Sequence, residues 1–346
     1  MTDRSGNNQA RRHPLRRVRS RDAATALLLL PLLLLAGACD RAGEPLPPAG
    51  PPALSVAPPD AHVRFAVIGD YGLAGKPEEE VATLVKSWQP DFVITTGDNN
   101  YPRGAAETID ANIGQYYSAF IAPYKGSFGS GAARNRFFPS LGNHDIHAAA
   151  AAAAYLAYFT LPGNGRYYDF TAGPAHFFAL DSDVREPDGT SGGSKQGRWL
   201  QTQLGASQSC WRIVYLHHPP YASGGKEAAR MRWPYKAWGA DVVLAGHQHT
   251  YERLAVEGVT YFVVGLGGGG DIDRFEQTAQ GSQKRYNGDY GAMLVAAESG
   301  TLVFRFVTRT GTVVDEYRQE KTCPVSSARV GSVLANQRVA VDDAPG

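Results

Sequence analysis

Short apolar runs alternate with helix-forming segments along the middle of the chain. The run 63–68 (Val-Arg-Phe-Ala-Val-Ile) predicts a buried strand, and Pro77 followed by three Glu residues predicts the first turn of a helix. Late in the chain, residues 290–297, 301–308 and 312–317 alternate like a meander of strands. Strands that alternate with helices and then close in hairpins indicate an α/β layered fold. We expect further strands at 91–95, 137–141, 177–180, 211–216, 242–245 and 259–264, and helices at 107–120 and 148–159.

The first 38 residues have the three parts of a bacterial secretory signal peptide. Seven Arg residues come first, an apolar run follows at 23–35, and Ala36-Gly37-Ala38 supplies small residues at its end. The apolar run is too short to be a good membrane-spanning helix. Residues 37–39 resemble a lipobox with Cys39 as the lipidated residue, whereas Ala36 and Ala38 equally suit ordinary signal peptidase. We therefore predict export to the bacterial periplasm or cell envelope, with a lipid anchor preferred over simple cleavage.

The chain after the signal peptide 1–38 divides into three parts by composition. Residues 39–61 are rich in Pro, Gly and Ala, which favours an extended tether over packing. Residues 322–346 lack periodicity and are expected to form a loose tail. The segment 62–321 between them has about 260 residues, which suffices for one large core. We therefore expect one globular domain held off a membrane by a tether.

The net charge changes once the signal peptide is set aside. The formal charge of the chain is +1, but residues 1–38 hold seven Arg against Asp3 and Asp22, so the remainder carries about −4. A mildly acidic domain gives no support for nucleic-acid binding. With Cys39 lipidated, Cys210 and Cys323 remain, and an exported compartment would permit a disulfide between them.

Five polar clusters each follow a strand-like run. Ligands of open α/β sheets bind outside the carboxyl ends of the strands, so these clusters are expected to converge. They offer carboxylates, an amide oxygen, imidazoles and a phenol, which hard and borderline metals prefer. Glycines before several of them permit tight turns and leave room for a ligand. The clusters are Gly69-Asp70-Tyr71-Gly72, Gly97-Asp98-Asn99-Asn100-Tyr101, Gly142-Asn143-His144-Asp145, His217-His218-Pro219-Pro220-Tyr221 and Gly246-His247-Gln248-His249-Thr250-Tyr251-Glu252-Arg253.

In this order, the clusters resemble the signature of the calcineurin-like metallophosphoesterases. Two details resemble the purple acid phosphatase branch: Gly72 stands where most of the superfamily has a His, and Tyr101 stands where that branch supplies a Tyr ligand. The resemblance covers about 62–320 and makes 62–321 a catalytic domain. It implies a four-layer metallophosphoesterase-type sandwich, an α/β fold with two mixed β-sheets flanked by helices.

The resemblance also implies two metal ions. The first would be Fe³⁺ bound by a phenolate, and the second a divalent ion, Zn²⁺, Mn²⁺ or Fe²⁺. Water held between two such cations is acidified to hydroxide near neutral pH and can attack phosphorus. His144 would face the substrate phosphate, with Asp145 orienting it, as the catalytic pair. The first ion would be held by Asp70, Asp98, Tyr101 and His249, and the second by Asp98, Asn143, His217 and His247.

Four further residues are candidates for substrate binding: Asn99, Arg103, His218 and Lys226. His218 is better explained as a partly buried neighbour of the metal ligand, and Arg103 is equally explained as a solvated side chain. The purple enzymes usually carry another His about nine residues after the equivalent of His217, where this chain has Lys226 and its neighbours. Lysine would be a poor acid, so an acidic pH optimum does not follow. Gly265–Gly270 lacks the Lys-Ser/Thr of a phosphate-binding loop and is expected to be a turn.

These observations predict an exported metal-dependent phosphomonoesterase that hydrolyses small-molecule phosphate esters with a metal-bridged hydroxide. A phosphodiesterase of the same superfamily is the first alternative, and the loops at 102–136 and 182–197 would distinguish the two by how open they leave the site. A non-catalytic binding lipoprotein is the second alternative, which a loss of metal ligands would indicate. The sequence leaves the physiological substrate, the metals bound in the cell and the oligomeric state open.

Overall fold

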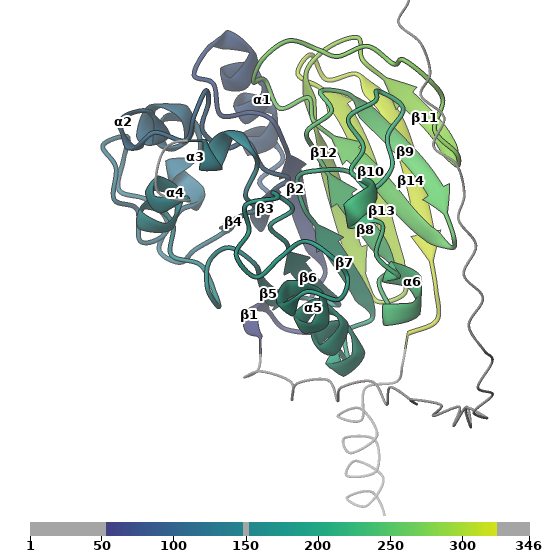
Figure 1. Cartoon of the computed structure of the whole chain (residues 1–346). Helices are drawn as coiled ribbons and strands as arrows, with labels where there is room; N and C mark the ends of the chain where they lie inside the picture. Colours follow the sequence, from purple (N-terminus) through teal and green to yellow (C-terminus); the bar gives the residue numbers. More distant parts are fainter. Residues whose placement is uncertain (1–52, 148–151, 324–346) are drawn as a thin grey trace, which may run out of the picture. The chain divides into compact units, whose positions relative to one another are not determined.

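The computed structural model describes residues 53–147 and 152–323, in which two β-sheets pack face to face (Figure 1). Both sheets contain parallel and antiparallel pairs, so both are mixed. The six-stranded sheet has the order β14 (Val313–Glu320), β13 (Thr301–Thr308), β12 (Gly291–Glu298), β2 (Val63–Ile68), β3 (Phe92–Thr95), β4 (Phe137–Pro139). The eight-stranded sheet has the order β1 (Leu54–Ala57), β5 (Tyr168–Ala172), β6 (Ala175–Ala179), β7 (Trp211–Tyr215), β8 (Val242–Ala245), β10 (Val259–Val264), β9 (Tyr251–Val256), β11 (Ser282–Tyr286).

The main hydrophobic core lies between the two sheets and is rich in phenylalanine. The rings of Phe65 and Phe92 stack at a centroid distance of 5.2 Å, and Phe138 and Phe170 stack at 4.0 Å. Phe177 meets Phe92 edge-on at 5.3 Å. These side chains come from both sheets and are fully buried, so aromatic contacts fix the spacing of the sandwich.

Helices cover the outer face of each sheet. The buried face of α1 (Lys76–Ser87) packs with the outer residues of β2 and β3, and α5 (Lys195–Ala206) packs on the eight-stranded sheet through Leu200 and Leu204. The resulting four layers confirm the expected fold class. The other helical segments are α2 (Ala106–Ile109), a π-helical turn (Asp110–Gly114), α3 (Gln115–Tyr117), α4 (Ala153–Tyr158), α6 (Tyr235–Trp238) and 3₁₀ turns at Ser118–Phe120, His144–Ile146 and Ala229–Met231.

Most expected elements are confirmed within a few residues, and two boundaries need correction. β1 pairs in parallel with β5, so residues 54–57 belong to the domain and the tether predicted for 39–61 was drawn too long. The Pro-rich surroundings concealed a four-residue strand that is held by a distant partner. The helix expected at 148–159 appears as α4, which begins only at Ala153, with 148–151 outside the described residues. Strands β5, β9 and β11 and helix α5 were not predicted.

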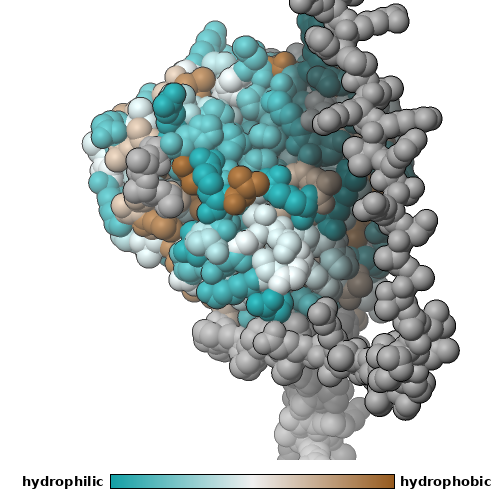
Figure 2. All heavy atoms as spheres, viewed as in Figure 1, coloured by the Kyte–Doolittle hydropathy of each residue, from teal (hydrophilic) through white to brown (hydrophobic). Residues whose placement is uncertain are grey.

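The predicted signal peptide, Cys39, most of the predicted tether and nearly all of the predicted tail lie outside the described residues. In the described part of the chain, every helix falls short of the length and hydropathy that crossing a membrane requires. On the face seen in Figure 2, apolar side chains occur as small separate groups among hydrophilic ones.

Cys210 and Cys323 form a disulfide that links the start of β7 to the residues after β14. The bond joins positions 113 residues apart, with a Cα–Cα distance of 5.0 Å. Because it closes a long loop, we expect the double substitution Cys210→Ser/Cys323→Ser to lower the free energy of unfolding by about 2–4 kcal/mol. Urea unfolding of both proteins measures this. An unchanged midpoint, with wild-type protein shown to be oxidised, would contradict it.

Candidate metal centre

The five polar clusters converge at the carboxyl ends of strands from both sheets. Asp70, Asp98 and Asn143 follow the parallel strands β2, β3 and β4 of the six-stranded sheet. His217 follows β7, and His247 follows β8, which are parallel neighbours in the eight-stranded sheet. The expected convergence is therefore confirmed, and the site spans the edge where the two sheets meet.

Three of the converging residues have left-handed backbone conformations. The φ angles are 54° at Asp70, 54° at Asp98 and 68° at His247. Non-glycine residues adopt this region at a cost, and such residues cluster at functional sites. Each follows a glycine, and at Gly97, itself at φ 91°, an added Cβ would lie 2.7 Å from Nδ1 of His217. The glycines therefore let the ligand-bearing turns approach one another.

The first donor group contains Asp70, Tyr101 and His249. Oδ1 of Asp70 lies 3.4 Å from Nε2 of His249 and 3.5 Å from the hydroxyl of Tyr101. The same hydroxyl is 3.2 Å from Nε2 of His249 and donates to Oδ2 of Asp98 at 3.0 Å. These four residues are the set that the sequence assigned to the first metal.

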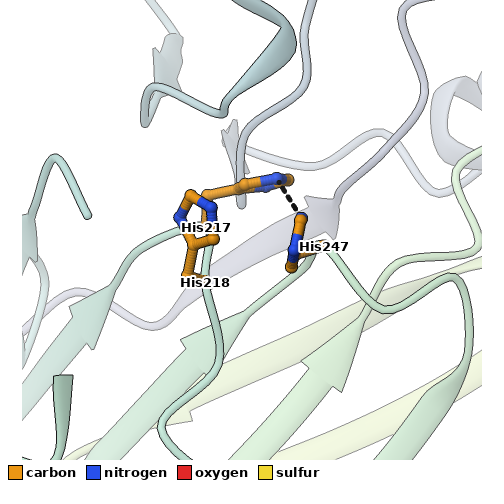
Figure 3. A group of neighbouring side chains, drawn as sticks. All are labelled: His217, His218 and His247. Atoms are coloured by element: carbon orange, nitrogen blue, oxygen red, sulfur yellow. Dashed lines mark hydrogen bonds between the residues drawn. The ribbon is translucent and has the colours of Figure 1, made fainter. Parts of the chain in front are cut away.

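The second donor group contains Asn143, His217 and His247, and it shares Asp98 with the first. Nε2 of His217 lies 3.0 Å from Oδ1 of Asn143, 3.1 Å from Nδ1 of His247 and 3.3 Å from Oδ2 of Asp98. Figure 3 shows the contact between His217 and His247. Oδ2 of Asp98 therefore faces both groups, in the position of a bridging ligand.

Hydrogen bonds behind the site orient its histidines. Nδ1 of His217 lies 2.8 Å from the carbonyl oxygen of Thr96, and Nδ1 of His249 lies 2.7 Å from that of Asp271. A carbonyl only accepts, so each Nδ1 carries a proton, and Nε2 is the nitrogen that offers a lone pair when the ring is neutral. The backbone N–H of His247 donates to Oδ2 of Asp70 at 2.9 Å. The donor set, its burial and these supports fit two cations of the oxygen- and nitrogen-preferring kind.

The acidic groups strongly perturb the protonation of their neighbours. Desolvation opposes a charge on His217, yet the carboxylates of Asp98 and Asp70 raise its pKa to about 9. Burial opposes a charge on Asp98 too, but His217 lowers the pKa of Asp98. Burial, followed by the carboxylates of Asp70 and Asp98, raises the pKa of Tyr101 far above its usual value. Only a strongly charged cation could make Tyr101 a phenolate here.

The raised pKa of His217 predicts that metal binding releases protons. The metal-free protein holds His217 protonated at pH 7, whereas a ligating imidazole must be neutral. We expect Zn²⁺ binding to release a proton from His217 at pH 7, with that release disappearing as the pH rises through about 9. Titration calorimetry in buffers of different ionisation enthalpy measures it, and a proton count that stays constant from pH 7 to 10 would contradict it. In metal-free protein this shift stabilises the fold fully below about pH 6.5 and ceases to do so above about pH 9.

His144 lies beside the donor groups, with its ring partly open to solvent. Its Nε2 is 4.0 Å from Oδ2 of Asp98, and its ring lies 4.3 Å from that of Tyr101. Nδ1 of His144 lies 2.7 Å from the carbonyl oxygen of Pro102, and its backbone N–H donates to Asp98. Pro102 and Asp98 therefore orient His144, which leaves Nε2 facing the site.

Asp145 does not orient His144, which corrects the expected catalytic pair. The buried Asp145 carboxylate accepts from the backbone N–H groups of Asn99 and Gly142 and from the amide of Asn99. Burial, followed by the charge of Asp98, raises the pKa of Asp145 to about 7. Asp145 faces the interior because its partners are backbone groups of two motif turns, so it holds those turns together.

Asn99 is also corrected, from substrate binding to structural support. Its side chain is fully buried, and its oxygen accepts from the hydroxyls of Tyr71 and Thr95. Its amide group donates hydrogen bonds to the carbonyl oxygen of Ser140 and to the carboxylate of Asp145. Its side chain has no hydrogen-bonding capacity left for a substrate.

The other three substrate candidates differ in their surroundings. Arg103 is exposed and has no hydrogen bond or ion pair with a described residue. Lys226 is exposed and pairs with Oδ2 of Asp273 at 2.7 Å, the oxygen that also accepts the backbone N–H of His249. His218 is buried beside His217 and His247, and one ring nitrogen of each lies within 4.8 Å of the others (Figure 3).

Sequence reasoning named the loop after β6 but missed that its residues support the site from the eight-stranded sheet. Asp183 binds the guanidinium of Arg185 through both of its oxygens, at 2.6 and 2.8 Å. Arg185 also donates to the carbonyl oxygens of Asn143 and Ile146, on either side of His144. Asp181-Ser182-Asp183 is itself a polar cluster after a strand, so the rule that found the five motifs could have found it.

Comparison with known proteins agrees with the geometry. The family model of the calcineurin-like phosphoesterases matches residues 63–251. Purple acid phosphatase 15 of Arabidopsis thaliana is 27% identical over 252 residues, 59% of this chain and 45% of that protein. Human acid phosphatase type 7 is 27% identical over 220 residues, 55% of this chain and 47% of that protein. The chain thus spans about half the length of these curated relatives.

Solved structures share the fold. The yellow lupin purple acid phosphatase PPD1 superposes with a TM-score of 0.61 and 18% identity, over 77% of this chain and 57% of that one. GAP50, described as the anchor in the inner membrane complex of Plasmodium, superposes with a TM-score of 0.55 and 18% identity, over 79% and 94%. The chain therefore belongs to the calcineurin-like phosphoesterase family, in its purple acid phosphatase-like branch.

Proposed function

We propose that this protein is an exported, metal-dependent phosphomonoesterase. The single observation that carries the proposal is the pair of donor groups that share Oδ2 of Asp98. Asp70, Asp98, Tyr101 and His249 would hold Fe³⁺. Asp98, Asn143, His217 and His247 would hold Zn²⁺, Mn²⁺ or Fe²⁺. Two cations bound there would acidify a water between them and neutralise the oxygens of a phosphate ester.

The residues around the donor groups supply binding and proton transfer. Because Nδ1 of His144 donates to the Pro102 carbonyl, only its imidazolium form has a further N–H, at Nε2. That N–H can bind a phosphate oxygen or protonate the leaving alkoxide. Asp145 and Arg185 hold the turn that carries His144, one from the interior and one from the β6 loop. A phosphate ester bound beside His144 would thus meet a fixed donor.

Tyr101 provides a test of the first metal. A phenolate bound to Fe³⁺ absorbs visible light, whereas a buried phenol does not. We expect Tyr101→Phe to remove the visible band of iron-loaded protein, with iron bound more weakly. Absorption spectra and iron content measure this, and Tyr116→Phe, which removes another buried phenol outside the site, is the control. A band that survives Tyr101→Phe would refute the phenolate while leaving the family membership intact.

The comparison of two substrates tests the function itself. The chain from residue 40 onward, loaded with iron and then zinc or manganese, would be given p-nitrophenyl phosphate and bis-p-nitrophenyl phosphate. We expect faster turnover of the monoester. Faster turnover of the diester would indicate the phosphodiesterase. Absence of both activities in protein with two bound metals would favour a non-catalytic role, since GAP50 shows that this fold also occurs in a protein described as an anchor.

Export and lipid attachment are a separate part of the proposal. They rest on the arginines, the apolar run and Cys39 in the first 39 residues. Mass spectrometry of the mature N-terminus after expression in a bacterial host tests both. Diacylglycerol on Cys39 would support the anchor, cleavage after Ala38 without lipid would support simple secretion, and an intact Met1 would refute export.

A further inference from the structure

Ser182, in the loop after β6, contacts His218 twice. The backbone N–H of His218 donates to Oγ of Ser182 at 2.9 Å, and the same Oγ lies 2.9 Å from Nδ1 of the His218 ring. Ser182 is fully buried, and its carbonyl oxygen accepts from Arg230 at 2.8 Å. The hydroxyl is thus held in place against one edge of the imidazole.

The hydroxyl of Ser182 determines which nitrogen of the neutral His218 ring carries the proton. Its oxygen already accepts the backbone N–H of His218, and its single hydrogen needs an acceptor. Among the described residues, Nδ1 of His218 is the one acceptor within hydrogen-bond distance. A buried donor left unpaired costs about 1–3 kcal/mol, so the hydroxyl donates to Nδ1. The neutral imidazole of His218 then carries its proton on Nε2.

In His217 and His249 the ring proton lies on the other nitrogen, Nδ1. His217 and His249 place Nδ1 against the carbonyl oxygens of Thr96 and Asp271, which only accept. Those rings carry a proton on Nδ1 and, when neutral, present a lone pair at Nε2. His218 is backed by a hydroxyl and presents an N–H at Nε2. Two adjacent histidines of one motif therefore offer a metal ligand and a hydrogen-bond donor.

The His218 ring faces the second donor group. Its centroid lies 4.4 Å from that of His247 and 5.0 Å from that of His217. Figure 3 shows one ring nitrogen of His218 on the side of these two residues and the other turned away. Since Nδ1 is the nitrogen bound to Ser182, the nitrogen toward the site is Nε2.

We propose that Ser182 fixes His218 as a hydrogen-bond donor to the phosphate group of the substrate, rather than as a third imidazole ligand of the second metal. The proposal rests on the proposed function, because it assigns a new contact within that site. Ser182 is a positioning residue, which acts through the His218 ring. The ligand recognised is an anionic phosphate oxygen, whether it belongs to an ester or to free phosphate.

Two amide substitutions that differ in length separate the roles of the ring nitrogens. The amide nitrogen of Gln reaches the position of Nε2, whereas that of Asn reaches the position of Nδ1. Inorganic phosphate would be titrated into full-length metal-loaded protein by calorimetry, with metal content measured for each variant. We expect His218→Asn to weaken phosphate binding about 10-fold or more and His218→Gln to retain most of it, both with two metals per chain.

Ser182 is tested with its own pair of variants. We expect Ser182→Ala to weaken phosphate binding and Ser182→Thr, which keeps the hydroxyl, to restore it. Nitrogen-15 NMR of histidine-labelled, zinc-loaded protein reads the ring directly: we expect protonated Nε2 at His218, against protonated Nδ1 at His217. A protonated Nδ1 at His218, or loss of a metal in His218→Asn, would make His218 a ligand and overturn the proposal. Equal phosphate affinity in His218→Asn and wild type would also overturn it.

These measurements separate the proposal from the proposed function. Wild-type protein that binds phosphate but hydrolyses neither p-nitrophenyl ester would refute the function, while the Asn and Gln variants still decide the role of His218. Hydrolysis by the wild type with unchanged phosphate binding in His218→Asn would refute only the His218 contact. Metal-loaded wild type that binds no phosphate would overturn both.

Discussion

Asp98→Asn should abolish the proposed phosphatase activity and reduce the bound metal from two ions to at most one. Oδ2 of Asp98 lies within 3.0–3.3 Å of ligand atoms from both donor groups, namely the hydroxyl of Tyr101 and Nε2 of His217. An amide cannot supply the negative charge that two cations share. Loss of several kcal/mol of metal-based stabilisation corresponds to at least about a 10³-fold fall in kcat/KM, at about 1.36 kcal/mol per tenfold change. Elemental analysis and steady-state kinetics on the same preparation measure both effects.

We expect Asp98→Asn to disturb the fold little. Oδ1 of Asp98 accepts the backbone N–H of His144, and the amide oxygen of Asn can still do so. Asp169→Asn is the matched control, because Asp169 also pairs with a histidine, His176, at 2.8 Å, and neither residue is one of the converging donors. The control should keep both metals and full activity. Two metals and near wild-type turnover in Asp98→Asn would rule out the bridging role.

His144→Ala should lower kcat by about 10²–10⁴-fold for alkyl phosphates while leaving both metals bound. The residue lies beside the donor groups without belonging to them, and its Nε2 faces the site. The fall should be smaller for p-nitrophenyl phosphate, because p-nitrophenolate leaves without needing a proton. Kinetics on the two substrates, with metal analysis, tests whether His144 acts as an acid.

His62→Ala is the control for this variant, since His62 is exposed and pairs with Glu298 at the surface. An equal loss on both substrates would assign His144 to phosphate binding rather than proton transfer. Full activity of His144→Ala on alkyl phosphates would remove it from the mechanism altogether.

The sequence predicted which polar residues converge because the information was local. Each motif follows a strand with a strong apolar signal, and parallel strands bring their carboxyl ends together. The order of the motifs then identified the family. Asp70, Asp98, Tyr101, Asn143, His217, His247 and His249 all meet in the structure.

What failed depended on contacts between distant segments. Asn99 and Asp145 lie within motifs, so they were assigned to substrate binding and catalysis. Their side chains instead form a hydrogen bond with each other, across 46 residues of sequence. Arg185 follows a strand of the eight-stranded sheet, and it donates to the turn of His144, which follows a strand of the six-stranded sheet. Neither segment has a sequence pattern that predicts this contact. β1 is too short to show periodicity and exists through its pairing with β5. Such tertiary partners are invisible to a local pattern.

The disulfide has a consequence for how the sandwich comes apart. Donors from the six-stranded sheet and donors from the eight-stranded sheet meet at the carboxyl ends of β3 and β7, while Cys210 precedes β7 at its other end. Bound cations would therefore join the sheets at one end and the Cys210–Cys323 bond at the other. A chelator and a reductant would each loosen a different end, and their effects on unfolding should add, because the two ends share no residue.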